Sequence, residues 1–204
     1  MTIHRIGAAF FVLLLATVPA LADETTDALK RAKASYRHGN MSKTYAQLEA
    51  AATLIVRRLS EQYAKTLPPA PQGWRAEPVS FRTKGKHRIG RGLVLRRNYF
   101  EKGGRGVATV QVNIDQQNLI ESAKSRGSNK KHAAAARRTL VPVKGAGHGF
   151  IKFDRSRGVG NIYAYVSNRI YITVTARNIK SQDFLTRLLS NWDYAGLKRT
   201  AGLN

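Results

Sequence analysis

Residues 159–177 have the sequence VGNIYAYVSNRIYITVTAR, in which aliphatic residues alternate with polar or aromatic ones. Successive side chains of a β-strand point to opposite faces of the sheet, so Ile162, Ala164 and Val166 are predicted to share one face. The same period of two assigns aliphatic faces to two further groups, Ile170, Ile172, Val174 and Ala176, and Ala108, Val110, Val112 and Ile114. These segments are predicted to be half-buried strands.

Glycine-containing turns lie between strand-like segments, at Gly103-Gly104 and at residues 156–158. Such turns indicate hairpins, and therefore a mainly antiparallel sheet. After the last strand, Ser181 is predicted to cap a helix, with Asp183 near its positive end. That helix is expected to cover the sheet with an apolar stripe made of Phe184, Leu185, Leu188, Leu189 and Trp192.

The first part of the chain has helical periodicity instead. A turn at His38-Gly39-Asn40 separates two segments whose apolar residues recur at helical spacing, namely Ala28, Leu29, Ala32 and Tyr36, and then Tyr45, Leu48, Ala52, Ile55, Leu59 and Tyr63. This pattern predicts an αα-hairpin. Pro68-Pro69-Ala70-Pro71 excludes a helix and favours an extended linker to the sheet. The predicted fold class is α+β: an N-terminal αα-hairpin, then a mainly antiparallel sheet covered by a C-terminal helix.

The N-terminus has the pattern of a secretory signal peptide. A cationic start at residues 1–5 precedes an apolar run that Pro19 ends, and Ala20-Leu21-Ala22 matches a cleavage site. The alternative, a membrane anchor, needs roughly 20 apolar residues, which is longer than this run. We therefore predict a periplasmic or secreted protein with a signal peptide at 1–22, a helical hairpin at 23–66, a linker at 67–74 and a sheet domain at 75–204. No later segment is predicted to span a membrane.

Three sequence motifs resemble those of a known protein family. They are Tyr36-x-x-Gly39-Asn40, the following helix with Leu48, Ala51, Ala52, Leu54 and Ile55, and Leu67-Pro68-x-x-Pro71-x-Gly73-Trp74. Together they resemble an uncharacterised family of exported bacterial proteins, which usually has Gly-Asp at the position of Gly39-Asn40. The helix pair also resembles a single tetratricopeptide-style pair. The sheet with its terminal helix is similar to the PsbP-like α-β-α sandwich of extrinsic photosystem proteins and secreted bacterial relatives. The resemblance implies a fold and no catalytic residues.

Charge is the main indication of function. The chain has 35 Lys and Arg against 12 Asp and Glu, a formal net charge of +23, and no cysteine, which excludes disulfides, thiol catalysis and thiolate metal ligands. So strong an excess attracts anions over about 8 Å at physiological salt. Two clusters in the sheet domain are predicted to bind anions: Arg82, Lys84, Lys86, Arg88, Arg91, Arg96, Arg97 and Arg105, and Lys124, Arg126, Lys130, Lys131, Arg137 and Arg138.

Aromatic residues accompany the basic clusters. Tyr163, Tyr165, Tyr171 and Arg177 are predicted on the strand faces opposite the aliphatic ones, where rings and guanidinium groups would suit a flexible anionic polymer. The alternative is that the tyrosines form a second buried face under the N-terminal helices. Likewise, the loop at 125–138 is either a basic arm that orders on an anion or a surface loop.

No motif fixes a chemical reaction, and no cofactor or metal is expected. The histidines outside the signal peptide lack metal-ligand spacing, and the carboxylates form no close pair. Asp115 and Asp154 both end strands, where capping and turn roles account for them. A hydrolase using His148 with Asp154 or Asp183 is an alternative.

The sequence favours a non-catalytic binding or accessory protein. Its expected partner is an anionic polymer, such as nucleic acid or acidic polysaccharide, lipid headgroups of an anionic membrane surface, or an acidic protein. A protein-interaction module acting through the helix pair is the alternative. The sequence does not indicate an oligomeric state.

Overall fold

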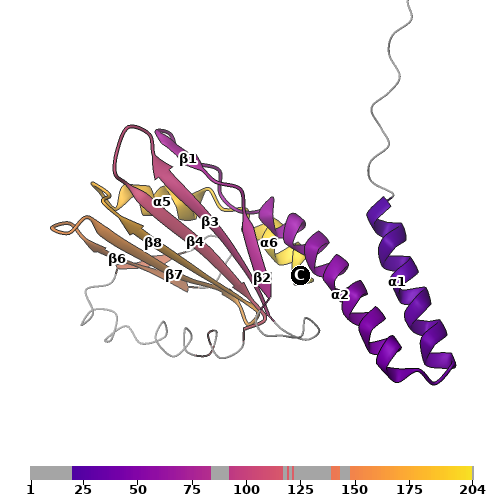
Figure 1. Ribbon diagram of the computed structural model, residues 1–204. Helices are drawn as coiled ribbons and strands as arrows, with labels where there is room; N and C mark the ends of the chain where they lie inside the picture. The colour runs from indigo at the N-terminus through magenta and orange to yellow at the C-terminus, as the bar shows by residue number, and fades with distance from the viewer. Residues whose placement is uncertain are drawn as a thin grey trace, which may run out of the picture. The chain divides into compact units, whose positions relative to one another are not determined.

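The computed structural model describes residues 20–83, 92–116, 119, 121, 139–142 and 148–203 (Figure 1). Most of the predicted signal peptide, the loop at 125–138, and the basic residues at 84–91 and 124–138 lie outside these ranges. The fold is α+β, as predicted: two N-terminal helices precede an antiparallel sheet and two short C-terminal helices. Two compact units divide between Leu54 and Ile55, inside the second helix rather than at the proline-rich segment.

The first unit contains α1 (Ala20–Arg37) and the first part of α2 (Met41–Ala64). Gly39 ends α1 in the left-handed region, with φ of 71°, and the amide of Asn40 donates to the carbonyl of Ser35 at 3.0 Å. This is the hydrogen bonding of a glycine-terminated helix end. The Asn40 side chain then accepts from the Lys43 amide at 3.0 Å and caps α2. The predicted αα-hairpin is confirmed.

The residues buried within the hairpin are small. Ala28, Ala32 and Ala51 are almost fully buried. Large apolar residues of the predicted helix faces are instead well exposed: Leu29, Tyr36, Tyr45, Leu48 and Ile55, together with Met41. Helical spacing therefore identified the helices correctly, but most of their large apolar residues do not pack inside the hairpin.

The second unit contains the sheet, and every strand pair in the described residues is antiparallel. The strand order is β1-β3-β4-β8-β7-β6-β5, and β2 also pairs with β3. The strands are β1 (Trp74–Ala76), β2 (Ser80–Thr83), β3 (Leu93–Glu101), β4 (Val107–Ile114), β5 (Thr139–Pro142), β6 (His148–Asp154), β7 (Val159–Ser167) and β8 (Ile170–Arg177). Gly103 and Gly158 have positive φ in the β3–β4 and β6–β7 turns, so both predicted hairpin turns are confirmed.

One face of the sheet forms the hydrophobic core. In β7 and β8, buried and partly exposed residues alternate over most of each strand, and the predicted aliphatic sets of β4, β7 and β8 are all buried. We call this the aliphatic face. Gly160 of β7 lies under α5 (Asp183–Ser190), where a β-carbon would approach the Leu185 Cδ1 atom to 2.5 Å. The absence of a side chain at this position therefore lets helix and sheet pack closely.

The C-terminal helices cover the aliphatic face, as predicted. Phe184, Leu185, Leu188 and Leu189 of α5 are buried in the core cluster. The prediction was wrong in detail, because the helix ends at Ser190 and Trp192 precedes a second helix, α6 (Tyr194–Thr200). Gln182, not Ser181, is the N-cap residue of α5 and makes no side-chain capping bond, whereas Asp193 caps α6 by accepting from the Gly196 amide at 2.8 Å.

The proline-rich segment is non-helical, as predicted, but it is anchored rather than free. Its Pro68 carbonyl accepts hydrogen bonds from the Tyr99 hydroxyl at 2.8 Å and from Arg97 Nη1 at 3.4 Å. Trp74, at its end, stacks on Phe184 with ring centroids 4.0 Å apart. Leu67 and Tyr63, from the end of α2, belong to the core cluster. In the described part of the chain, no helix is long and apolar enough to cross a bilayer.

Candidate anion-binding face

The face of the sheet opposite the core, which we call the polar face, follows from the alternation of the strands. Antiparallel register aligns its side chains in rows across the sheet. One such row runs from β2 to β6 and consists of Ser80, Arg96, Gln111, Thr173, Tyr163 and Phe150. Polar and aromatic residues therefore lie on this face where the aliphatic face has Ile, Val, Leu and Ala.

Basic residues occupy most of the exposed positions on the polar face. Five of them are exposed in strands of the described sheet, namely Arg75, Arg82, Arg96, Lys152 and Arg177. The carboxylates at the same face are already hydrogen-bonded: Glu77 accepts from Asn98 at 2.9 Å, and Asp154 accepts from Ser156 at 2.7 Å. The Ser156 hydrogen bond, aided by Arg157, lowers the pKa of Asp154. Both carboxylates keep their charge, but the five cations outnumber them, so the described part of the face has a net positive charge.

A shallow pocket of about 190 Å³ lies at the β2–β3–β4 side of this face. Its lining residues are Ser80, Phe81, Arg82, Val94, Arg96 and Gln111. Arg82 pairs across the strands with Val94, and Arg96 is two residues farther along β3. Such diagonal neighbours are about 7–8 Å apart. Among the described ion pairs, none includes Arg82 or Arg96.

The predicted site residues do not all lie together. Arg82 and Arg96 line the pocket, and Arg105 is exposed in the β3–β4 turn. Arg97 lies on the aliphatic side instead, where its Nε donates to the Glu77 carbonyl at 3.0 Å and its guanidinium lies 5.7 Å from the centre of the Tyr99 ring. The other predicted residues are outside the described ranges: Lys84, Lys86, Arg88, Arg91, Lys124, Arg126, Lys130, Lys131, Arg137 and Arg138.

Two basic residues of the polar face were missed from the sequence. Lys152 is exposed between the more buried Ile151 and Phe153, so strict alternation in β6 would have identified it. Arg75 is exposed in the short strand β1, and its guanidinium stacks over the Phe100 ring at 4.4 Å from the ring centre. A strand of only three residues is too short for its sequence pattern to show which face each residue occupies. The pairing of β1 with β3 shows that Arg75 lies on the polar face.

The tyrosines lie opposite the aliphatic residues, as predicted. Tyr163, Tyr165 and Tyr171 are partly exposed rather than buried. From Ile55 onward, the helical residues in the core cluster pack against the aliphatic face. Within the second unit the tyrosines are therefore partly buried, and their burial under the N-terminal helices stays a prediction. Phe150 on the same face is 7% exposed and stacks on Tyr163 with centroids 4.9 Å apart.

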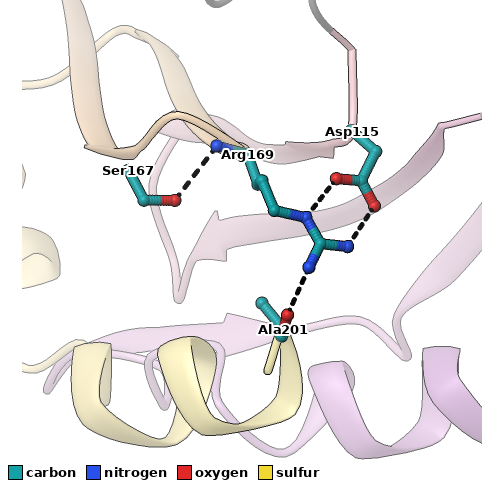
Figure 2. Close-up of polar contacts among 4 residues, drawn as sticks. All are labelled: Asp115, Ser167, Arg169 and Ala201. Atoms are coloured by element: carbon teal, nitrogen blue, oxygen red, sulfur yellow. Dashed lines mark hydrogen bonds and ion pairs between the residues drawn. The ribbon is translucent and has the colours of Figure 1, made fainter. Parts of the chain in front are cut away.

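Asp115 directly follows β4 and forms an ion pair with Arg169, and the segment that it was predicted to cap lies mostly outside the described residues. Figure 2 shows Arg169 held by both Asp115 carboxylate oxygens, with nitrogen–oxygen distances of 2.5 and 2.7 Å. Arg169 also donates to the Ala201 carbonyl at 2.6 Å, just after α6. This bidentate pair, which raises the pKa of Arg169, joins the end of β4 to the β7–β8 turn and the C-terminal segment.

The residues proposed for a hydrolase have structural contacts where they are described. Asp154 accepts from Ser156 and from the Arg157 amide in the β6–β7 turn, and Asp183 accepts from the Ser181 hydroxyl at 3.1 Å. His148 begins β6, but its side chain lies outside the described part. The described residues include no cluster of three His, Cys, Asp or Glu residues suited to a metal ion.

Comparison with known proteins adds no functional assignment. No family model matches this chain, and no curated protein or solved structure matches it either. The resemblance to exported bacterial proteins and to PsbP-like domains therefore stays a prediction, based on the residues quoted above.

Proposed function

We propose that this chain is an exported, non-catalytic binding or accessory protein whose polar face engages an anionic partner. The observation that supports it best is the set of exposed basic residues on that face, whose neighbouring carboxylates are already hydrogen-bonded. Guanidinium groups bind phosphate and carboxylate with paired hydrogen bonds. The anion could belong to a nucleic acid, an acidic polysaccharide, a lipid headgroup or an acidic protein.

A matched pair of double variants tests this proposal. Arg82→Gln with Arg96→Gln removes two charges from the polar face, and Arg187→Gln with Arg199→Gln removes two exposed charges from α5 and α6. Binding to a panel of anionic polymers is measured across a salt series. We expect the first variant to bind more weakly, with a log–log salt slope shallower by about one to two. The control retains nearly full affinity. Equal losses in both variants would mean that only total charge matters.

Export is part of the proposal and has its own test. The protein is expressed in a Gram-negative host, and the N-terminus of the periplasmic or secreted form is determined. We expect cleavage after Ala22, so that the mature chain begins at Asp23. Retention of Met1 in the recovered protein would contradict this part.

A second candidate function is protein interaction through the helix pair. It is favoured by exposed side chains in the first unit, where Tyr36 is 61%, Met41 60% and Tyr45 48% exposed. In cells, cross-linking to a partner should be lost in Tyr36→Ser with Tyr45→Ser and kept in Arg82→Gln with Arg96→Gln. The reverse result would favour the polar face.

A further inference from the structure

The pocket beside Arg82 and Arg96 differs from the rest of the polar face because it combines a hollow with several kinds of polar group. Ser80 contributes a hydroxyl, which donates to the Arg96 carbonyl at 3.4 Å, and Gln111 contributes an amide, whose nitrogen donates to Asn113 Oδ1 at 2.8 Å. No carboxylate lines the pocket. Because two cations and two neutral polar groups meet there, the ligand should carry one negative group and adjoining hydroxyls.

The size of the pocket limits what it holds. Pockets for drug-sized molecules measure about 300–1,000 Å³. This one measures about 190 Å³ and lies open on the sheet surface. It therefore suits one unit of a polymer rather than a whole small molecule, and the polymer would continue along the sheet.

The neighbouring side chains favour a sugar over a nucleobase. Single-stranded nucleic acid is held by successive bases that stack on aromatic rings. Phe81 pairs with Leu95 and therefore points to the aliphatic side of β2, and Tyr163, farther along the row, is only partly exposed and stacks on Phe150. The residues that follow Arg96 in the row are Gln111 and Thr173, which offer an amide and a hydroxyl to sugar hydroxyls.

We propose that the pocket between Arg82 and Arg96 binds a carboxylated sugar residue of an acidic polysaccharide. The two guanidinium groups hold the carboxylate, and Gln111 and Ser80 bind hydroxyl groups of the sugar. The inference rests on the proposed function, since it names the anionic partner of the polar face.

Binding to polygalacturonate at near-physiological salt tests the site. The comparison ligands are the methyl-esterified polymer, which lacks the charge, and single-stranded oligothymidylate, which carries phosphodiesters. We expect the wild type to bind polygalacturonate more tightly than either. Arg82→Gln with Arg96→Gln should weaken this binding at least about tenfold, because both bonds to the carboxylate are charge-assisted. Arg187→Gln with Arg199→Gln should change it less than about threefold.

A neutral variant separates a shaped site from general attraction. Ser80→Ala leaves the charge unchanged and alters an exposed side chain that lines the pocket. It should weaken polygalacturonate binding several-fold without changing the salt slope, while thermal unfolding monitored by circular dichroism stays the same. An unchanged affinity in this variant would overturn the role of the Ser80 hydroxyl and the shaped pocket.

The remaining outcomes separate the inference from the proposed function. Equal losses in the two double variants overturn the pocket but leave a polyanion-binding protein. Oligothymidylate binding that is equally tight and equally dependent on Arg82 and Arg96 replaces the carboxylated sugar with a phosphodiester. If no anionic polymer binds at all, both the inference and the proposed function fail.

Discussion

Arg96 and Arg97 are adjacent in the sequence and lie on opposite faces of β3. Arg96 is exposed beside the pocket, whereas Arg97 donates to the carbonyls of Glu77 and Pro68. The charge pattern of the sequence alone does not distinguish the two residues, because both belong to the same basic cluster. The period of two in a strand separates a surface cation from a structural one.

The first prediction concerns these two arginines. Arg97→Gln should lower the free energy of unfolding by about 1–3 kcal/mol, because two carbonyl acceptors lose a charged donor. Arg96→Gln should lower it by less than about 0.5 kcal/mol, since that side chain is exposed. Urea unfolding measures both. Equal destabilisation would contradict the assignment of the two faces.

The second prediction concerns Arg169, which contacts Asp115 and the Ala201 carbonyl. Arg169→Ala should cost about 1–2 kcal/mol of stability. We choose the lower part of the range for such bonds because the Arg169 and Asp115 side chains are 42% and 43% exposed and solvent screens the pair.

Asp115→Asn is the matched variant for this pair. Asp115 has a φ of 54°, a conformation that asparagine tolerates. The substitution therefore removes the charge without adding backbone strain, and urea unfolding should give a smaller loss than for Arg169→Ala. A larger loss would mean that the carboxylate has a further role.

At the scale of elements, the α1–α2 connection combines a glycine-terminated helix and an asparagine cap. Gly39 needs a left-handed conformation, and Asn40 satisfies a free amide at the start of α2. The family-like motif Tyr36-x-x-Gly39-Asn40 therefore has a structural explanation. The same holds for Gly73, with φ of 80°, and for Trp74, which stacks on Phe184.

The third prediction concerns this connection. Gly39→Ala should destabilise the hairpin by about 1–2 kcal/mol through left-handed strain, and Asn40→Ala by about 1 kcal/mol through loss of the cap. Asn40→Asp should be nearly neutral, since aspartate is an equally good cap. Helical circular dichroism during thermal unfolding measures all three, and an unaffected Gly39→Ala variant would rule out the strained conformation.

At the scale of the whole molecule, buried tyrosines should govern stability at high pH. Burial raises the pKa of Tyr63 and of Tyr99 to about 12, from an ordinary value of 10.0. Above pH 10 the unfolded chain loses phenolic protons that the folded protein keeps. Stability from these groups is therefore complete below pH 10 and is lost as the pH rises through about 12.

The fourth prediction follows from this linkage. Tyr63→Phe should make the fall in unfolding free energy above pH 10 less steep, as measured by urea unfolding at a series of pH values. Tyr36→Phe, at a side chain that is 61% exposed, is the control and should leave the pH dependence unchanged. Identical curves for Tyr63→Phe and the wild type would show that Tyr63 titrates normally.

Sequence patterns predicted the helix pair, three strands, two hairpin turns and the cover provided by α5. These features depend on local periodicity and on turn residues with special backbone conformations. The site was harder to predict. The charge clusters in the sequence include Arg82 and Arg96, which lie on the polar face, and Arg97, which lies on the aliphatic side, but not Arg75 or Lys152 of the polar face. Charge density along the sequence does not show which face of a strand a residue occupies.

The sequence by itself determined which residues alternate, where the chain turns, and that the protein is strongly basic and free of cysteine. Only the tertiary structure decided which residues become neighbours. Pairing of β2 with β3 brings Arg82 beside Arg96, the proline-rich segment docks on Tyr99, and Arg169 reaches Asp115 across 54 residues of sequence. Periodicity is a local property of the backbone, whereas register and docking depend on which distant surfaces bury the most apolar area together.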